Sequence, residues 1–177
     1  MPNRITISLL AATCLNANIA LADKNYFGGS VSFVDYSETG IGDDASLTML
    51  TGRLGTKFNE NFSGEMRIGL GVADDTVNIL GTDVEVELDN MFGAYVRGGL
   101  QAADSFYPYV ALGYTRGELS ASVPGFSISE SESDISFGFG ADVDINKKLT
   151  LNIEYMNYYD KDGAELDGFG LGLVAKF

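Results

Sequence analysis

The sequence predicts an all-β fold, an eight-stranded antiparallel up-and-down β-barrel, and three observations lead to it. Apolar and polar residues alternate strictly in eight segments, which is the period of a strand with two different faces. The 177 residues include 22 glycines and 45% hydrophobic residues, too apolar for disorder and too glycine-rich for a helical protein. The N-terminus has the pattern of an export leader, and after it no stretch reaches the roughly 18 apolar residues of a membrane-spanning helix.

Residues 1–22 are predicted to be a cleavable signal peptide. Arg4 supplies a positive start, residues 5–15 an apolar core, and residues 20–22 (Ala-Leu-Ala) a small-x-small cleavage site. Residues 23–177 then form one β-barrel domain that a bacterium exports. The single cysteine, Cys14, lies in the leader, so the exported domain is expected to have neither disulfides nor thiolate metal sites.

The predicted strands follow one another along residues 23–177 without a linker or a second domain. They cover about residues 25–36, 47–58, 62–72, 88–100, 106–117, 134–145, 149–159 and 166–177. The connections alternate between short turns, at 59–61, 101–105 and 146–148, and long loops, at 37–46, 73–87, 118–133 and 160–165. This alternation is typical of an up-and-down antiparallel sheet. In the second long connection, residues 76–79 and 83–88 flank Gly81 as a predicted hairpin tip.

The two faces of the strands can be assigned in two ways. In a soluble barrel the apolar face points inward, whereas in a transmembrane barrel it meets lipid and the polar face lines the lumen. The soluble alternative is a periplasmic lipocalin-like binding barrel, which would enclose an apolar ligand among residues such as Phe33, Leu54 and Ile68. In lipid the sheet must close on itself, because an open edge would leave backbone groups unpaired.

The charge distribution favours the transmembrane arrangement. The polar strand faces carry five bases and four acids, although the whole chain has 25 acidic and 11 basic residues. A closed lumen must pair its charges, because an unpaired buried charge is costly. The predicted lumen charge network consists of Arg53, Lys57, Glu65, Arg67, Arg97, Asp142, Asp144, Glu154 and Lys176. The long-loop end carries 18 acids against only Arg116 and Lys161, which predicts a strongly acidic surface there.

Aromatic residues also favour the transmembrane arrangement. They fall at both ends of the apolar strand faces, as in the girdles that flank the lipid-facing band of a transmembrane barrel. The predicted girdles contain Phe27, Phe58, Phe62, Phe106 and Phe177 at the short-turn end, and Phe92, Tyr114, Phe137, Tyr159 and Phe169 at the long-loop end. We therefore predict a transmembrane β-barrel.

A family resemblance is carried by three segments, LTGRLGTKFNENFSGEMRIGLG (50–71), PYVALGYT (108–115) and GFGLGLVAKF (168–177). They are similar to the small OmpA-like outer-membrane β-barrels of Gram-negative bacteria, often described as outer membrane protein beta-barrel domain or "porin family" proteins. The resemblance implies location in the cell outer membrane and contact with its lipid and lipopolysaccharide. It also implies that the barrel-assembly machinery reads the C-terminal strand. The assembly signal would be Phe169, Leu171, Leu173 and Phe177, with Ala175 where a larger apolar residue is commoner.

The interior of an eight-stranded barrel is just wide enough to be filled by side chains. The charge network is therefore expected to hold the barrel shut, and a narrow gated ion channel is the alternative. We do not expect an enzyme, because the chain has no histidine to act as a general base or to orient a nucleophile. Neither a cofactor nor a dedicated metal site is predicted, since the acidic segments lack the spacing of an EF-hand loop.

The long loops are the predicted seat of function. Their dense negative charge suits a basic partner, or divalent cations that bridge to lipopolysaccharide phosphates. The predicted function is an envelope structural or surface-interaction role, which includes adhesion. The protein is expected to be a monomer and not to contact nucleic acid.

Overall fold

The computed structural model describes residues 24–39, 44–79, 82–123, 125–161 and 163–177. The predicted signal peptide, residues 1–22, lies outside the described residues. The strands are β1 (Asn25–Glu38), β2 (Ala45–Lys57), β3 (Phe62–Ala73), β4 (Asp75–Ile79), β5 (Thr82–Gly99), β6 (Phe106–Val123), β7 (Phe126–Asp144), β8 (Leu149–Lys161) and β9 (Ala164–Lys176). Among the described residues, none forms a helix long and apolar enough to cross a membrane.

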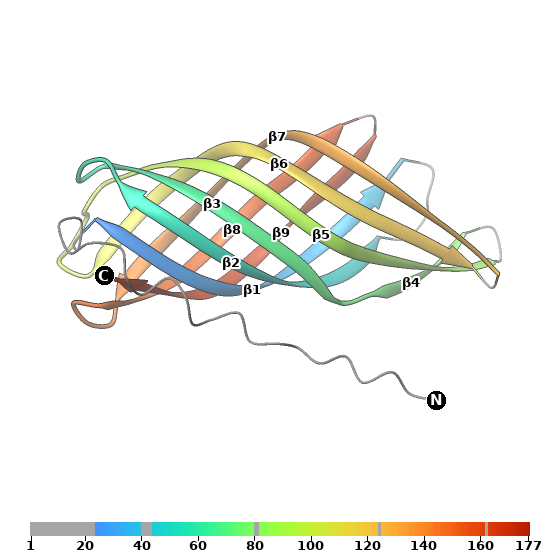
Figure 1. Ribbon diagram of the computed structural model, residues 1–177, viewed down its shortest axis with the longest axis horizontal. Helices are drawn as coiled ribbons and strands as arrows, with labels where there is room; N and C mark the ends of the chain where they lie inside the picture. The colour runs from blue at the N-terminus through green and yellow to red at the C-terminus, as the bar shows by residue number, and fades with distance from the viewer. Residues whose placement is uncertain (1–23, 40–43, 80–81, 124, 162) are drawn as a thin grey trace.

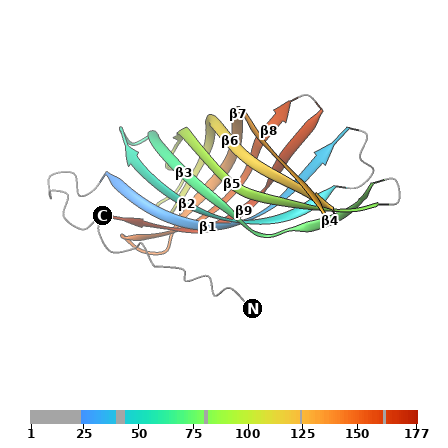
Figure 2. The same ribbon diagram turned by 45° about the vertical axis from the view of Figure 1, so that its right-hand side comes forward.

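The strands close into an antiparallel barrel (Figures 1 and 2). Consecutive strands pair along the ring, and β1 pairs with β9 from Tyr26 opposite Lys176 to Glu38 opposite Ala164. β3 and β4 both pair with β5 and are separated only by Asp74, so together they occupy one place in the ring. The ring therefore has eight places, and the predicted closed eight-stranded antiparallel barrel is confirmed.

The alternation along each strand places apolar side chains outside and polar side chains inside. Phe33 and Val110 are 65% and 63% exposed, whereas their sequence neighbours Ser32 and Ala111 are each 3% exposed. This is the reverse of a soluble barrel, whose apolar face is buried. The lipocalin-like alternative is therefore not favoured, because residues such as Phe33 point away from the interior.

Two of the short turns are built in the same way. The side-chain oxygen of Asn59 accepts hydrogen bonds from the N–H groups of Asn61 and Phe62, at 2.8 Å each. The side chain of Asn146 does the same for Lys148 and Leu149. Asn favours such turns because its side chain satisfies backbone donors a few residues ahead. The short-turn end of the barrel is thereby fixed locally, which helps to set the strand register.

One side of the barrel extends beyond the other at the long-loop end (Figure 1). β5 and β6 have 18 residues each and β7 has 19, whereas β1, β2, β8 and β9 have 13 or 14. The predicted hairpin before residue 88 is present as β4 and β5, and the connection at 118–133 is also a hairpin, with Gly125 at φ 88° near its tip. We call residues 75–79, 82–89, 117–123 and 125–133 the extended sheet.

Three irregularities shift the strand register, next to Met49, between Leu88 and Asn90, and between Asn157 and Tyr159. Such a bulge inserts one unpaired residue and so reverses which side chains point inward beyond it. The predicted girdle position of Tyr159 is therefore wrong. Its side chain is partly buried and packs against the interior apolar cluster.

Candidate functional site

Five charged side chains meet in the centre of the lumen, and each is less than 5% exposed: Arg53, Glu65, Arg67, Arg97 and Glu154. They come from β2, β3, β5 and β8, at positions where the strand alternation points inward. Arg67 lies between the two glutamates, with Nη2 2.6 Å from Glu65 Oε2 and Nη1 2.6 Å from Glu154 Oε1. The structure thus brings these predicted lumen residues into one ion-pair network.

Arg97 continues this network toward the short-turn end. Its Nη1 lies 2.6 Å from Glu65 Oε1 and its Nη2 lies 2.6 Å from Asp142 Oδ2, while its guanidinium stacks 3.5 Å from the ring centroid of Tyr109. Tyr109 donates a hydrogen bond of 2.8 Å to Glu154. Buried ions tolerate loss of water only when such hydrogen bonds replace it. The network therefore forms a polar core that links the barrel walls.

The remaining predicted lumen residues lie nearer to solvent. Asp144 and Lys176 form an ion pair of 2.6 Å whose side chains are 34% and 27% exposed. Lys57 is exposed, and together with Asp144 and Lys176 it lines a small cavity at the short-turn mouth. These three residues therefore mark the mouth of the lumen, while the central five fill it.

A buried apolar layer lies on the other side of the charged network, toward the long-loop end. Its largest side chains are those of Val34, Leu47, Met49, Leu88, Met91 and Met156, all nearly inaccessible. The predicted filling of the lumen was the charge network, and a separate apolar layer was not predicted. The sequence contains a sign of this layer. Val34 lies two residues from Ser32, and Leu47 lies two residues from Met49, so each points to the same inward face as its partner.

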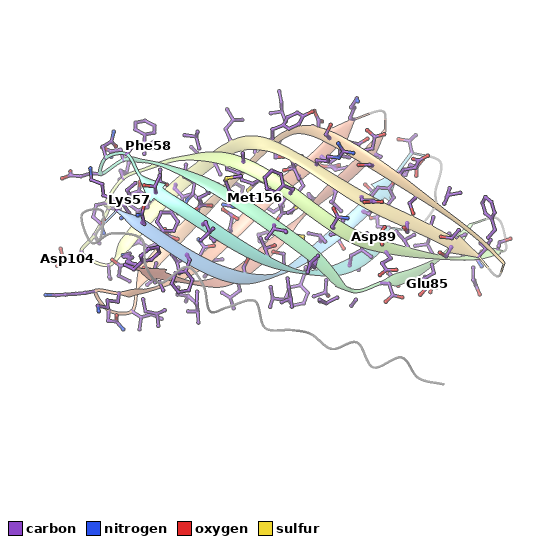
Figure 3. All side chains as sticks on the ribbon, in the orientation of Figure 1. Lys57, Phe58, Glu85, Asp89, Asp104 and Met156 are labelled. Carbon is purple, nitrogen blue, oxygen red and sulfur yellow. The ribbon has the colours of Figure 1, made fainter. Side chains whose placement is uncertain are left out.

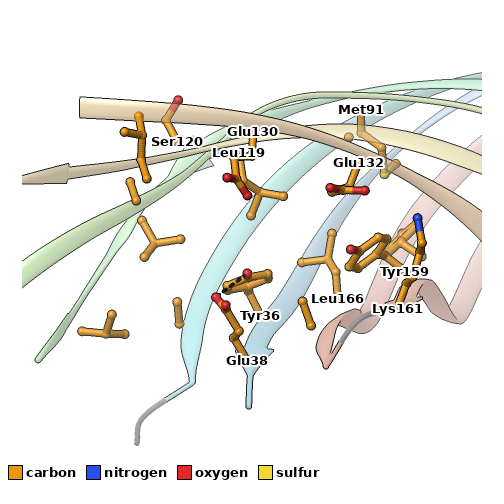
Figure 4. Close-up of a pocket in the computed structure, with 18 of the residues that line it drawn as sticks. Tyr36, Glu38, Met91, Leu119, Ser120, Glu130, Glu132, Tyr159, Lys161 and Leu166 are labelled. Atoms are coloured by element: carbon orange, nitrogen blue, oxygen red, sulfur yellow. Dashed lines mark hydrogen bonds between the residues drawn. The ribbon is translucent and has the colours of Figure 1, made fainter. Parts of the chain in front are cut away.

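The lumen opens beyond the apolar layer into a cavity of about 380 Å³, which we call the vestibule. The extended sheet forms one wall of the vestibule (Figure 4). Glu38, Glu130 and Glu132 line it together with aliphatic and tyrosine side chains. These glutamates belong to the predicted acidic long-loop end, whereas a cavity at that end was not predicted.

Further carboxylates lie on the outward face of the extended sheet. Glu85 and Glu87 alternate with the inward-facing Val84 and Val86, and Glu85 and Asp89 are visible on this sheet in Figure 3. The hydrogen bond with the neighbouring Asp74 side chain, together with the negative charge of that side chain, raises the pKa of the Glu85 carboxyl. In the described part of the chain, no group of three or more acidic, histidine or cysteine side chains is arranged to hold a metal ion.

The other predicted girdle and assembly residues lie on the outer surface. The side chains of the other predicted girdle residues are 41% to 58% exposed: Phe27, Phe58, Phe62, Phe106, Phe92, Tyr114 and Phe137. The predicted assembly residues Phe169, Leu171, Leu173 and Phe177 are also exposed, by 49% to 62%. An apolar exterior around a paired polar core is the arrangement of a barrel in lipid.

Comparison with protein families agrees with this arrangement. A family model described as "Outer membrane protein beta-barrel domain" matches residues 6–177. The chain belongs to this family. It is accordingly a β-barrel protein of the cell outer membrane, as predicted. No curated protein sequence matches the chain.

Solved structures of outer-membrane barrels share the fold. Ail of Yersinia pestis aligns with a TM-score of 0.65 and 14% identity over 88% of this chain and 99% of its own. Neisserial surface protein A aligns with a TM-score of 0.65 and 12% identity over 86% and 97%. OprG of Pseudomonas aeruginosa aligns with a TM-score of 0.59 and 14% identity over 88% and 97%. At these identities the likeness establishes the fold alone.

Proposed function

We propose that this outer-membrane barrel is an anchor for an interaction surface, and that its extended sheet binds a basic partner outside the cell. The observation that carries the proposal is the one-sided projection of β4 to β7 beyond the rest of the barrel (Figure 1). Its outward face bears the carboxylates of Glu85, Glu87 and Asp89. Complementary charge of this kind raises the rate of encounter with a basic protein and disfavours acidic ones.

The extended sheet also offers a free backbone edge. In the described residues, β7 pairs with β8 only from Phe137 onward, although β7 begins at Phe126. Residues 126–136 of β7 are paired on their other side with β6, as far as Val123 opposite Phe126. Unpaired N–H and C=O groups along such an edge can accept a strand from another protein. An added strand would supply affinity, while the acidic face would supply selectivity.

Charge distinguishes this proposal from binding of a sulfated polymer. Ail of Yersinia pestis has been crystallised with the heparin analogue sucrose octasulfate, and that complex aligns with a TM-score of 0.61 and 14% identity. In the present chain the extended sheet is acidic, and like charges would repel a sulfate. A divalent cation is a weaker candidate than a basic protein, because the described carboxylates are not clustered for metal binding.

A binding measurement on the barrel in lipid nanodiscs tests the proposal. The probe is a lysine decapeptide, and sucrose octasulfate is the anionic comparison. We expect saturable binding of the peptide that weakens as salt is added, and no binding of the sulfate. The double substitution Glu85→Gln/Glu87→Gln should weaken peptide binding roughly tenfold, which corresponds to about 1.4 kcal/mol.

The matched control removes two exposed charges from the opposite end of the barrel, with Glu60→Gln/Asp104→Asn. Both double variants have the same net charge, so only the position of the lost charges differs. Equal weakening of peptide binding by the two variants would show that only the net charge of the protein matters, and this would contradict the proposal. So would binding of sucrose octasulfate in preference to the peptide.

A further inference from the structure

The vestibule is an apolar cavity in a place where the membrane does not account for apolar side chains. The aliphatic part of its wall comes from the two hairpins of the extended sheet, as Val77, Val84, Val86, Leu119, Ala121 and Ile128. These side chains point to the cavity and not to lipid, since the outward positions between them carry acids and serines. Water against such a wall is unfavourable, so an apolar group that displaces it gains free energy.

Charged and aromatic side chains also line the cavity. Glu130 and Glu132 come from β7 of the extended sheet and Glu38 comes from β1, and Lys161 is the single basic side chain among the described lining residues. Tyr36 donates a hydrogen bond of 3.0 Å to Glu38, as Figure 4 shows. Burial, together with the bond to Glu38, raises the pKa of the Tyr36 hydroxyl, so it stays protonated and keeps donating at neutral pH.

Tyrosine faces and carboxylates together select a positive ligand. Tyr36 and Tyr159 both line the cavity, and the face of a tyrosine ring attracts an organic cation such as a quaternary ammonium. The glutamates add a net negative field, which would repel an anion and would give no advantage to a neutral molecule. The valines of β4 and β5, together with these glutamates and tyrosines, therefore suit the two ends of one amphipathic molecule.

The cavity has a closed floor. Met91, Thr115 and Tyr158 lie at its base, and Met91 and Tyr158 are almost fully buried. Thr115 is hydrogen-bonded to Tyr95 and to Ser136, and Ser136 donates to the backbone carbonyl of Tyr158 at 2.9 Å. A molecule that enters from the long-loop end would therefore be held in the vestibule and would not pass into the charged lumen.

We propose that the vestibule binds a small amphipathic organic cation, with its head between the glutamates and tyrosine rings and its apolar body against the valines of β4 and β5. The volume of about 380 Å³ lies within the range of small-molecule sites, which are mostly apolar with a few polar groups that fix orientation. This site is separate from the partner surface proposed above, because the two use opposite faces of the extended sheet.

Calorimetric titration with hexyltrimethylammonium tests the site, with the barrel in nanodiscs and empty nanodiscs as the blank. We expect saturable binding to one site. Hexanol and hexyl sulfate, which keep the apolar body but change the head, should bind at least roughly tenfold more weakly. Glu130→Gln/Glu132→Gln should weaken the cation by a similar factor, and Val84→Phe should reduce binding by filling the apolar end of the cavity.

Glu85→Gln/Glu87→Gln is the matched control, since it removes two charges from the outward face of the same sheet. It should leave the cation affinity within about twofold while it weakens the lysine peptide, so the two proposals can fail independently. The altered gel mobility of unheated samples verifies that each variant is folded. Equal binding of hexanol and the cation, equal weakening by the two double variants, or heat no greater than that of empty nanodiscs would each overturn the site.

Discussion

Arg67 and Glu154 join opposite walls of the barrel through two parallel hydrogen bonds, 2.6 Å from Nη1 to Oε1 and 2.9 Å from Nη2 to Oε2. Arg67 lies on β3 and Glu154 on β8, which stand four places apart in the ring. A bidentate pair fixes orientation as well as distance. The pair therefore acts as a strut across the lumen, and several expectations depend on it.

Replacing Glu154 should destabilise the barrel strongly. Glu154→Ala would leave the buried Arg67 with half of its carboxylate partners, and breaking a buried pair typically costs about 3–5 kcal/mol. Lys176→Met is the control, because its pair with Asp144 is about one-third exposed and contributes about 1 kcal/mol or less. Urea unfolding in lipid vesicles, followed by circular dichroism, measures both. Similar losses of unfolding free energy for the two variants would show that the central network is not a stabilising core.

The lumen is expected to block ions. Refolded protein in planar bilayers should give no large, steady conductance, because the charged network and the apolar layer fill the interior. Removing the strut with Arg67→Ala/Glu154→Ala should raise the frequency of brief openings. A large, steady current through the unaltered protein would contradict a filled lumen and would favour the channel alternative.

Gly168 should not tolerate a side chain. A Cβ at this position would collide with the backbone carbonyl of Phe33 on the neighbouring β1, whereas a Cβ at Gly29 would meet only the Thr51 carbonyl at 3.7 Å. Gly168→Leu is therefore expected to cost at least about 2 kcal/mol through overpacking. Gly29→Leu, on the exposed face, should fold normally. The folded fraction of each variant can be read from gel mobility before and after boiling, and equal fractions would refute the steric argument.

Asp75 should tie β4 to β2 in a pH-dependent way. Its carboxylate accepts hydrogen bonds from the N–H groups of Ser46, at 2.9 Å, and of Thr76, at 2.8 Å, and these hold its pKa below the usual range. A lowered folded pKa gives stability that is complete above the unfolded value of about 3.9 and is lost as pH falls through the folded value.

The measurement for this contact is the NMR shift of the Ser46 amide. It should stay constant from neutral pH to about pH 4 and change only in more acidic solution. Asp75→Asn keeps an acceptor oxygen but removes the titration, so its Ser46 shift should not follow the same curve. A midpoint above the ordinary range of aspartate would contradict the assigned direction.

The sequence was sufficient for the strands and for the faces of most of them, because a membrane barrel imposes a strict period of two. Phe33 and Ser32 could be assigned to opposite faces without any structure. The central ion pairs could be anticipated as a group, since Arg53, Arg67 and Glu154 share the inward parity. The ion-pair partner of each residue could not be assigned. Strand pairing determines which residues are neighbours within the sheet, but it does not determine which side chains meet across the lumen.

Tyr159 and the vestibule show where alternation stops being informative. A bulge has no reliable marker in a single sequence, yet it exchanges the two faces for every residue beyond it. Residues 118–133 also alternate, but with serine and glutamate, so the segment looked like a polar loop. Its strand structure depends on pairing of β6 with β7, which a local pattern of polar residues does not reveal.

The pairing of β1 with β9 has a consequence for synthesis of the chain. The first and the last strands are neighbours in the ring, so the contact that completes it joins segments separated by almost the whole described length. Until β9 is available, the nascent protein has two open edges, at β1 and at β8, and both would be unprotected in lipid. Interrupted chains therefore cannot complete their own hydrogen bonding, and the topology itself separates finished molecules from unfinished ones.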